Sequence, residues 1–220
     1  MSMWWKDKSS DTWHEAIDRI TRDRVMRQLV SAVGPCGLSP RKDYFVVLVQ
    51  SILNQQVSIK AAEAMFLKLR SHMPGKRITP TGVYELITRG DEPTIRSCGL
   101  SRQKQSYLLD LSQRFINGSI QPRRFSQMND DALIEHLTQI KGIGRWTVEM
   151  VLMFALNRPD VWPVDDLGLR HSAMLHYGLD RDDYEAMNRL GDRFRPYRTV
   201  AAWYLWRGRH LAGKSVRSSG

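Results

Sequence analysis

The chain has 220 residues, of which 42% are hydrophobic, so it can bury a core as one domain or as two joined lobes. No apolar run approaches the length of a membrane span, and charges interrupt residues 1–11 before a secretory apolar region develops. The 33 lysines and arginines exceed the 23 acidic residues, and the formal charge of +10 favours a polyanionic partner such as nucleic acid.

Almost every periodic segment predicts a helix, and no run of alternating residues predicts a strand. The segment 42–54 is apolar nearly all round, which indicates a buried helix. Glycine and proline pairs separate the other helices expected in the first half of the chain, which cover 12–33, 61–72, 82–89 and 93–97.

The second half continues in the same way. A helix over 101–118 ends at Asn117-Gly118, and Asn129 or Asp130 can cap the next one, whose apolar positions share one face: Leu133, Ile134, Leu137 and Ile140. Gly178 is the expected stop of a helix that starts at Asp165-Asp166. The remaining helices are expected over 145–156, 182–194 and 196–211, and the whole pattern predicts an all-α chain of about ten helices.

A glycine-flanked turn, Gly142-Ile143-Gly144, lies between two of these helices without slack, which describes a helix-hairpin-helix over 130–156. The N–H groups from Gly142 to Arg145 are expected at a helix N-terminus, where they can bind a phosphate oxygen without reading sequence. Arg145 adds a cation at the same place. No metal is required, although the hairpin carbonyls from Ile140 to Ile143 can hold a monovalent cation.

An acidic pair, Asp165 and Asp166, follows the second of these helices. Aspartate before a helix is usually only an N-cap. The apolar residues on both sides, 161–164 and 167–169, instead favour a position at the mouth of an apolar surface, where the field of a carboxylate acts in a low dielectric. Aromatic residues that suit a base pocket lie in the flanking regions: Trp146, Trp162, Trp203, Tyr204 and Trp206, with Trp203 expected in the core.

Residues 133–170 resemble the helix-hairpin-helix (HhH-GPD) DNA glycosylase superfamily, and most closely its 3-methyladenine DNA glycosylase II branch in the compact form without an N-terminal β domain. Two further stretches match that branch: Ile52-Leu53-Asn54-Gln55-Gln56-Val57-Ser58 with Ala61-Ala62, and Gly99-Leu100-Ser101 with Lys104 and Tyr107-Leu108. The resemblance runs from about residue 15 to 212. It implies a single catalytic unit of two helical lobes with a cleft between them, one over 42–157 and the other over 1–41 and 158–220 with the aspartate at its edge.

The resemblance also implies roles for single residues. Asp166 matches the catalytic aspartate, and Trp206 matches a position that stacks on a flipped base. Gln56 matches the wedge that fills the gap in the duplex, while Gln55 either shares that role or only bonds backbone at a helix junction. Trp146, Trp162 and Asp165 complete the predicted pocket.

Two departures from the superfamily pattern imply a monofunctional hydrolase without a cofactor. Trp146 stands where the lyases carry their nucleophilic lysine, and Lys141 is expected on the phosphate side. The two cysteines, Cys36 and Cys98, are too few for the cluster of the iron–sulfur branch, and both are expected as small apolar residues in a reducing cytoplasm. The implied reaction excises alkylated purines of the 3-methyladenine and 7-methylguanine type from double-stranded DNA and leaves an abasic site.

Three alternatives remain open. A non-catalytic helix-hairpin-helix DNA-binding protein explains the charge and the turn but not Asp166. An enzyme for oxidised or mismatched bases fits poorly without the lysine and the cluster cysteines, and an intact Asp166 argues against a degenerate enzyme that binds damage without cutting. The expected protein is a monomer, located with the nucleoid in the cytoplasm of a prokaryote or in the nucleus of a eukaryote.

Overall fold

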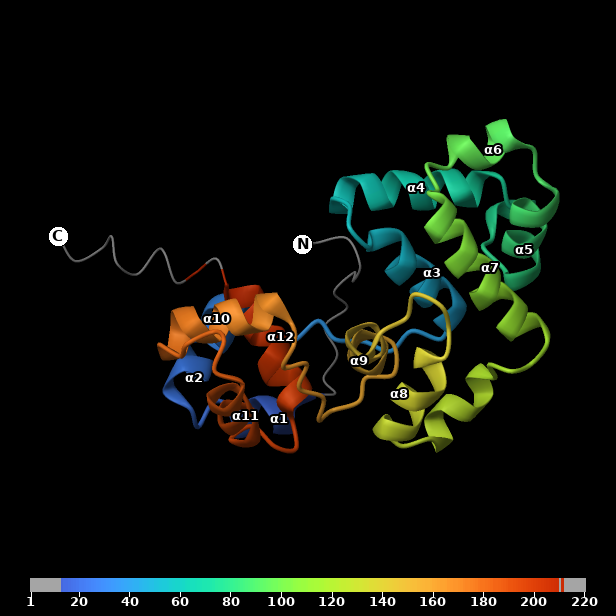
Figure 1. Ribbon diagram of the computed structural model, residues 1–220. Helices are drawn as coiled ribbons and strands as arrows, with labels where there is room; N and C mark the ends of the chain where they lie inside the picture. Colours follow the sequence, from blue (N-terminus) through green and yellow to red (C-terminus); the bar gives the residue numbers. More distant parts are fainter. Residues whose placement is uncertain (1–12, 210, 212–220) are drawn as a thin grey trace. The chain divides into compact units, whose positions relative to one another are not determined.

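The computed structural model describes residues 13–209 and 211, and every regular element within them is helical (Figure 1). Residues 1–11, which carry the expectation about secretion, lie outside the described part. The contacts divide the chain into two units, one comprising Arg41–Val151 and the other the described residues up to Pro40 and from Leu152 onward. The division falls between Val151 and Leu152, inside a helix, rather than at the boundary expected after residue 157.

The first unit is built around α3, whose residues Leu48, Val49, Ile52 and Leu53 are completely buried, as its apolar sequence predicts. Helices α4 and α7 pack against α3, and α5 packs against α7. The α-helices of this unit are α3 (Tyr44–Asn54), α4 (Ile59–Ser71), α5 (Pro80–Arg89), α6 (Glu92–Ser97), α7 (Arg102–Ile116), α8 (Asp130–Thr138) and α9 (Arg145–Phe154), the last of which extends past the division. Two short 3₁₀ helices, η2 (Pro74–Lys76) and η3 (Pro122–Gln127), were not predicted.

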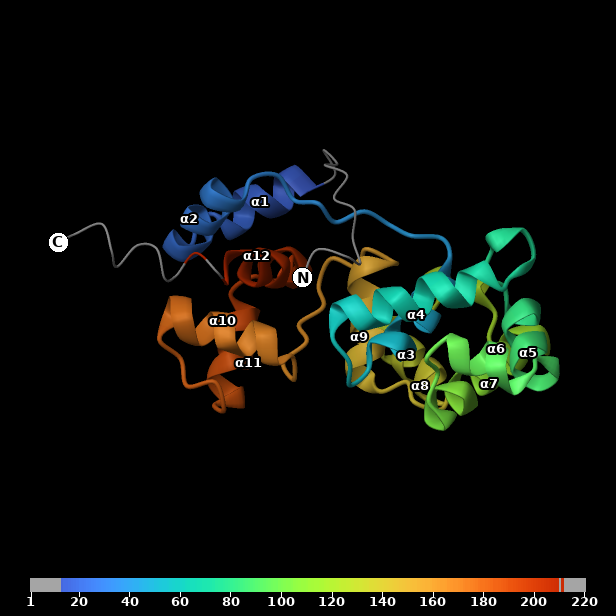
Figure 2. The same cartoon turned by 90° about the horizontal axis from the view of Figure 1, so that it is seen from above.

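The second unit is built around α12, which Figure 2 shows between the α1–α2 pair and the α10–α11 pair. Its elements are α1 (His14–Ile20), α2 (Arg24–Val33), α10 (Leu167–Tyr177), α11 (Tyr184–Asp192) and α12 (Arg198–Gly208). Almost the whole of α12 is buried, and Trp203 lies in the core as predicted, with 3% of its surface exposed.

The single helix predicted over 12–33 is wrong, because α1 ends at Ile20 and α2 begins at Arg24. Asp23 causes the break: its side chain accepts the backbone N–H groups of Val25 and Met26 and thereby caps α2. The part of the chain that the structure describes therefore holds twelve α-helices. At α8 the cap is Asn129 rather than Asp130.

The structure describes both cysteines and the helices that bear on a membrane span. Cys36 and Cys98 are both buried, and burial raises the pKa of the Cys98 thiol. Between residues 13 and 211, none of the helices described is both long and apolar enough to cross a bilayer.

Candidate active site

Asp166 is the N-cap residue of α10, and one oxygen of its carboxylate accepts hydrogen bonds from the backbone and from a tryptophan. Oδ1 accepts the backbone N–H of Leu169 at 2.6 Å and the indole N–H of Trp206 at 2.7 Å. The residue is half-buried. The N-terminus of the helix and the two donors complement the negative charge. Asp166 therefore caps α10, and its catalytic role stays a prediction.

Trp206 reaches Asp166 from α12, forty positions further along the chain. Its ring is buried, with 7% of its surface exposed, and stacks on Phe154 with 5.6 Å between the ring centroids. Gly168 permits the close approach, since a Cβ at this position would lie 3.0 Å from Asp166 Oδ1 and 3.3 Å from Trp206 Cδ1. The hydroxyl of Ser172 donates to the carbonyl of Leu205 and ties α10 to α12 beside this pair.

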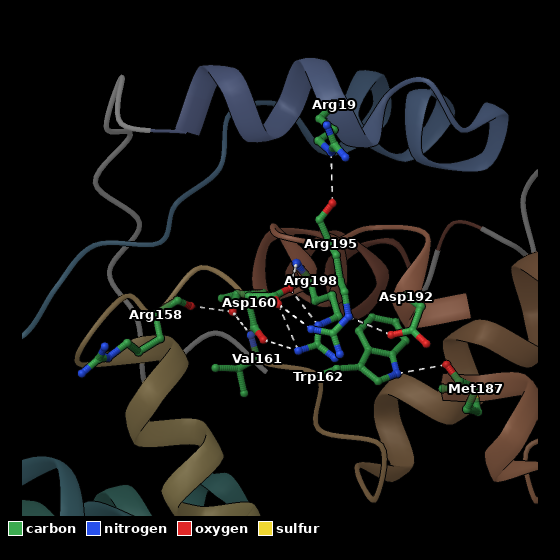
Figure 3. A network of polar contacts seen from close by, with 10 residues as sticks. Arg19, Arg158, Asp160, Val161, Trp162, Met187, Asp192, Arg195 and Arg198 are labelled. Atoms are coloured by element: carbon green, nitrogen blue, oxygen red, sulfur yellow. Dashed lines mark hydrogen bonds and ion pairs between the residues drawn. The ribbon is translucent and has the colours of Figure 1, made fainter. Parts of the chain in front are cut away.

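The segment that leads to Asp166 is tied to the N-terminal end of α12 by charge (Figure 3). Asp160 Oδ1 accepts Arg198 Nε at 2.8 Å, and its Oδ2 accepts Arg195 Nη1 at 2.9 Å. Arg198 Nη2 also donates to the carbonyl of Asp160 at 2.7 Å. Arg198 and Asp160 are largely shielded from water, with 17% and 26% of their side chains exposed, which strengthens the pair relative to a surface ion pair.

The side chain and the backbone of Thr199 fix the same segment a second time. The hydroxyl of Thr199 donates to the carbonyl of Arg158 and accepts the N–H of Val161, and the N–H of Thr199 donates to the carbonyl of Pro159. Residues 158–161 thus lie alongside the first turn of α12. Because α12 also carries Trp206, one helix positions both the loop before Asp166 and the donor to its carboxylate.

Trp162, which was predicted to line the base pocket, is buried, with 8% of its surface exposed, and its pocket role stays a prediction. Its indole N–H donates to the carbonyl of Met187 at 3.1 Å, and a Cβ on Gly191 would lie 2.8 Å from its ring. The ring centroid lies 6.4 Å from that of Phe194. Trp162 is therefore a core residue that anchors the loop to α11, while Asp165 is exposed beside Asp166 and its pocket role stays a prediction.

The hairpin between α8 and α9 is the predicted phosphate-binding turn. Gly142 has a φ of +77°, and a Cβ on it would lie 2.2 Å from the ring of Tyr107, so backbone conformation and close packing both require glycine. The N–H of Ile143 donates to the carbonyl of Ile140 at 3.0 Å and is used inside the turn. The N–H groups of Gly142, Gly144 and Arg145 remain candidates to bind a phosphate oxygen.

Gly144 and Arg145 lie on an open side of the hairpin. A Cβ on Gly144 would meet nothing within 4 Å. Arg145 opens α9 with 59% of its side chain exposed, and its Nε lies 3.1 Å from Oε1 of Glu149 one turn later. The guanidinium is thus oriented by a carboxylate and still faces solvent, as a phosphate-binding cation has to.

The turn after α3 carries the predicted wedge. Gln56 is exposed and has a φ of +57°, a left-handed conformation that is uncommon for residues other than glycine. Gln55 is half-buried, and its Nε2 donates to the carbonyl of Gly142 in the hairpin at 2.7 Å. Of the two roles considered for Gln55, bonding to backbone is the one that this structure contains.

Trp146 lies on the first turn of α9 with 46% of its surface exposed. It belongs to the unit of the hairpin, whereas Asp166 and Trp206 belong to the other unit. Nearly half of the residue's surface therefore faces solvent. Its place in a base pocket stays a prediction.

Sequence reasoning did not predict two contacts that hold the turns of the candidate site in place. Lys104 is buried, and its ammonium donates to the carbonyl of Leu53 at the end of α3. The N–H of Lys141 donates to Asp110 Oδ2 at 2.9 Å, which ties the hairpin to α7. Lys104 stood in a matched motif, but nothing in its sequence surroundings told which atom it would contact.

No group of three or more His, Cys, Asp or Glu side chains that could hold a metal ion occurs among residues 13–209 and 211. The monovalent cation at the hairpin carbonyls stays a prediction. Two of those carbonyls already accept hydrogen bonds, that of Ile140 from the N–H of Ile143 and that of Gly142 from Gln55 Nε2.

Comparison with known proteins gives three consistent relationships beside a family match. DNA-3-methyladenine glycosylase 1 of Schizosaccharomyces pombe is 36% identical over 196 residues, which cover 86% of this chain and 84% of that protein. The structure of a 3-methyladenine DNA glycosylase from the same yeast in complex with abasic DNA superposes with a TM-score of 0.77 at 34% identity, covering 87% of this chain and 95% of that one. The DNA-3-methyladenine glycosidase of Bacillus halodurans gives a TM-score of 0.77 at 31% identity, covering 97% and 94%.

The family model described as HhH-GPD superfamily base excision DNA repair protein matches residues 49–196, which include both glutamines of the turn, the hairpin and Asp166. The all-helical fold agrees with that match. The chain therefore belongs to the HhH-GPD superfamily of base excision DNA repair proteins.

Proposed function

We propose that this DNA glycosylase is a monofunctional hydrolase that removes alkylated purines of the 3-methyladenine and 7-methylguanine type from double-stranded DNA. It acts as a monomer, without a cofactor, wherever the cell keeps its DNA: at the nucleoid of a prokaryote or in the nucleus of a eukaryote. The names of its relatives, which are 3-methyladenine DNA glycosylases, support the substrate class.

The observation that carries the proposal is the setting of Asp166. Its Oδ1 is held by the indole of Trp206 and by the first turn of α10, so the carboxylate has a fixed orientation before any substrate arrives. A preoriented negative charge needs no reorganisation when positive charge develops near it. Capping of α10 requires only the bond from the N–H of Leu169, and the indole of Trp206 adds a second donor that further fixes the carboxylate.

The reaction begins with extrusion of the damaged nucleotide from the duplex, since its glycosidic bond is out of reach while the base is stacked. The hairpin holds the phosphate backbone through N–H groups and Arg145, and this grip carries no sequence information. Gln56, exposed at the tip of its turn, fills the space that the nucleotide leaves.

Bond cleavage then follows from the charge of the damaged base. An N3- or N7-alkylated purine is cationic, so it departs with the electron pair of the C1′–N bond and requires no strong general acid. The sugar develops oxocarbenium character, which Asp166 stabilises, and water adds to C1′ with loss of a proton. A cationic purine over an exposed indole such as Trp146 gains about 0.5–2 kcal/mol.

The absence of a lyase step rests on Trp146. A lyase forms a Schiff base through an amine, and an indole at this position supplies none. The buried ammonium of Lys104 is occupied by the carbonyl of Leu53. We therefore expect the sugar–phosphate backbone to stay intact after the base is released.

The test is incubation of the wild-type protein with duplexes that each carry one N-methylated purine. The expected products are the free methylated base and a strand that breaks only after alkali treatment. Duplex binding without release of any base would favour the non-catalytic DNA-binding alternative. A covalent adduct trapped by borohydride would refute the monofunctional assignment.

A further inference from the structure

Helix α7 holds together the two turns to which the proposed function assigns DNA contacts. Lys104, near its N-terminal end, donates to the carbonyl of Leu53 in the last turn of α3. Tyr107, one turn later, packs its ring on Gly142 of the hairpin. Figure 1 shows α7 running beside α3 in the same unit. The end of α3 and the hairpin thus both contact α7.

The contact of Lys104 is a strong local constraint. Its side chain is buried, and burial lowers the pKa of its ammonium group. The last carbonyls of a helix carry partial negative charge, so a cation that reaches them from a neighbouring helix stabilises the end of α3 where it stops. Gln55 and Gln56 follow that end immediately.

Gln55 makes the direct link between the two turns. Its Nε2 lies 2.7 Å from the carbonyl oxygen of Gly142, eighty-seven positions along the chain. The next residue, Gln56, has a φ of +57°, which costs free energy for a residue with a Cβ and persists only where the surroundings enforce it. The bond of Gln55 lies one residue before this strained tip and is placed to enforce it.

We propose that Gln55 is a positioning residue that couples phosphate binding at the hairpin to insertion of Gln56 into the duplex. Its amide fixes the tip of the wedge turn relative to Gly142, so a hairpin seated on a phosphate presents Gln56 at one defined place. This inference rests on the proposed function, since it assumes that the hairpin grips DNA and that Gln56 is the wedge. It assigns Gln55 an action through Gln56 rather than a contact of its own with the base stack.

The test uses Gln55→Met, which keeps the length of the side chain and removes the amide donor. Gln121→Met is the matched control, since Gln121 Nε2 also donates to a glycine carbonyl of this unit, that of Gly118, at 2.9 Å. Both substitutions are combined with Gln56→Ala in double-mutant cycles. Thermal unfolding of each variant accompanies the measurements.

Two readouts are measured. The first is the fluorescence change of 2-aminopurine placed beside an abasic-site analogue, which reports entry of the wedge without any excision. The second is the single-turnover excision rate constant. Gln55→Met is expected to lower that rate constant about tenfold, which corresponds to about 1.4 kcal/mol, and to reduce the fluorescence amplitude. In the Gln56→Ala background the same substitution should change either readout by less than about twofold.

Affinity for undamaged duplex should stay within about twofold in Gln55→Met, and Gln121→Met should behave as wild type. Additive losses of Gln55→Met and Gln56→Ala would overturn the inference, as would a fall in undamaged-duplex affinity parallel to the fall in rate. A wild type that excises no base but still shows the Gln55-dependent fluorescence change would refute the proposed function and leave the coupling standing. A wild type that excises the base at a rate that Gln55→Met does not change would refute the coupling and leave the proposed function standing.

Discussion

Replacing Trp206 by phenylalanine separates the two contacts that this residue makes. The substitution removes the N–H that donates to Asp166 Oδ1 at 2.7 Å and keeps an aromatic ring facing Phe154. A hydrogen bond to a charged group contributes about 1.5–3 kcal/mol. If Asp166 has to keep this orientation while the glycosidic bond breaks, the excision rate constant should fall by about 10- to 150-fold.

The measurement is the single-turnover rate constant on a duplex with one methylated purine, together with the free energy of unfolding from urea denaturation. Trp203→Phe is the control, because Trp203 is buried on the same helix, with 3% of its surface exposed, and packs edge-on against Tyr204. Both variants lose the same volume from the core, and only Trp206→Phe should lose excision beyond its loss of stability. Equal rate constants for the two folded variants would refute the role given to the indole N–H.

Two further predictions concern DNA affinity and stability. Arg145→Ala should weaken binding to damaged and undamaged duplex alike and should reduce the slope of log affinity against log salt by about one, so an unchanged slope would contradict a phosphate contact. Burial, with Asp23 beside it, raises the pKa of the Tyr177 phenol above its value in the unfolded chain. The protonated phenol therefore adds to the free energy of unfolding. This contribution is complete below about pH 10 and is lost at up to about 1.4 kcal/mol per pH unit above it. Urea unfolding between about pH 9 and about pH 11 should therefore show a shallower decline for Tyr177→Phe than for wild type, and identical slopes would contradict this account.

Local signals in the sequence were enough to predict several elements. Asp166 caps α10 and Gly178 ends it with a φ of +67°, because capping depends on residues within one turn of the helix end. The break at Asp23 escaped prediction because the amphipathic pattern continues through it. An aspartate inside such a pattern does not show by itself whether it faces solvent or caps a new helix.

The contacts of the site residues also go beyond what local signals in the sequence predict. Trp162 and Trp206 were both predicted to line the base pocket, but the indole of the first bonds to Met187 and that of the second to Asp166. The two cases differ only in tertiary contacts, which the spacing of residues does not encode. The bond of Gln55 to Gly142 joins positions eighty-seven residues apart and belongs to the same class.

The most direct test of the central claim is the single-turnover excision rate of Asp166→Asn on a duplex with one methylated purine. Asparagine caps helices about as well as aspartate, so the substitution removes the charge with little effect on folding. Asp183→Asn is the matched control, because Asp183 caps α11 by accepting the N–H of Ala186 at 2.8 Å. We expect Asp166→Asn to excise at least about 100-fold more slowly with unchanged affinity for DNA, and Asp183→Asn to match wild type. Excision by Asp166→Asn at the wild-type rate would contradict the proposed mechanism.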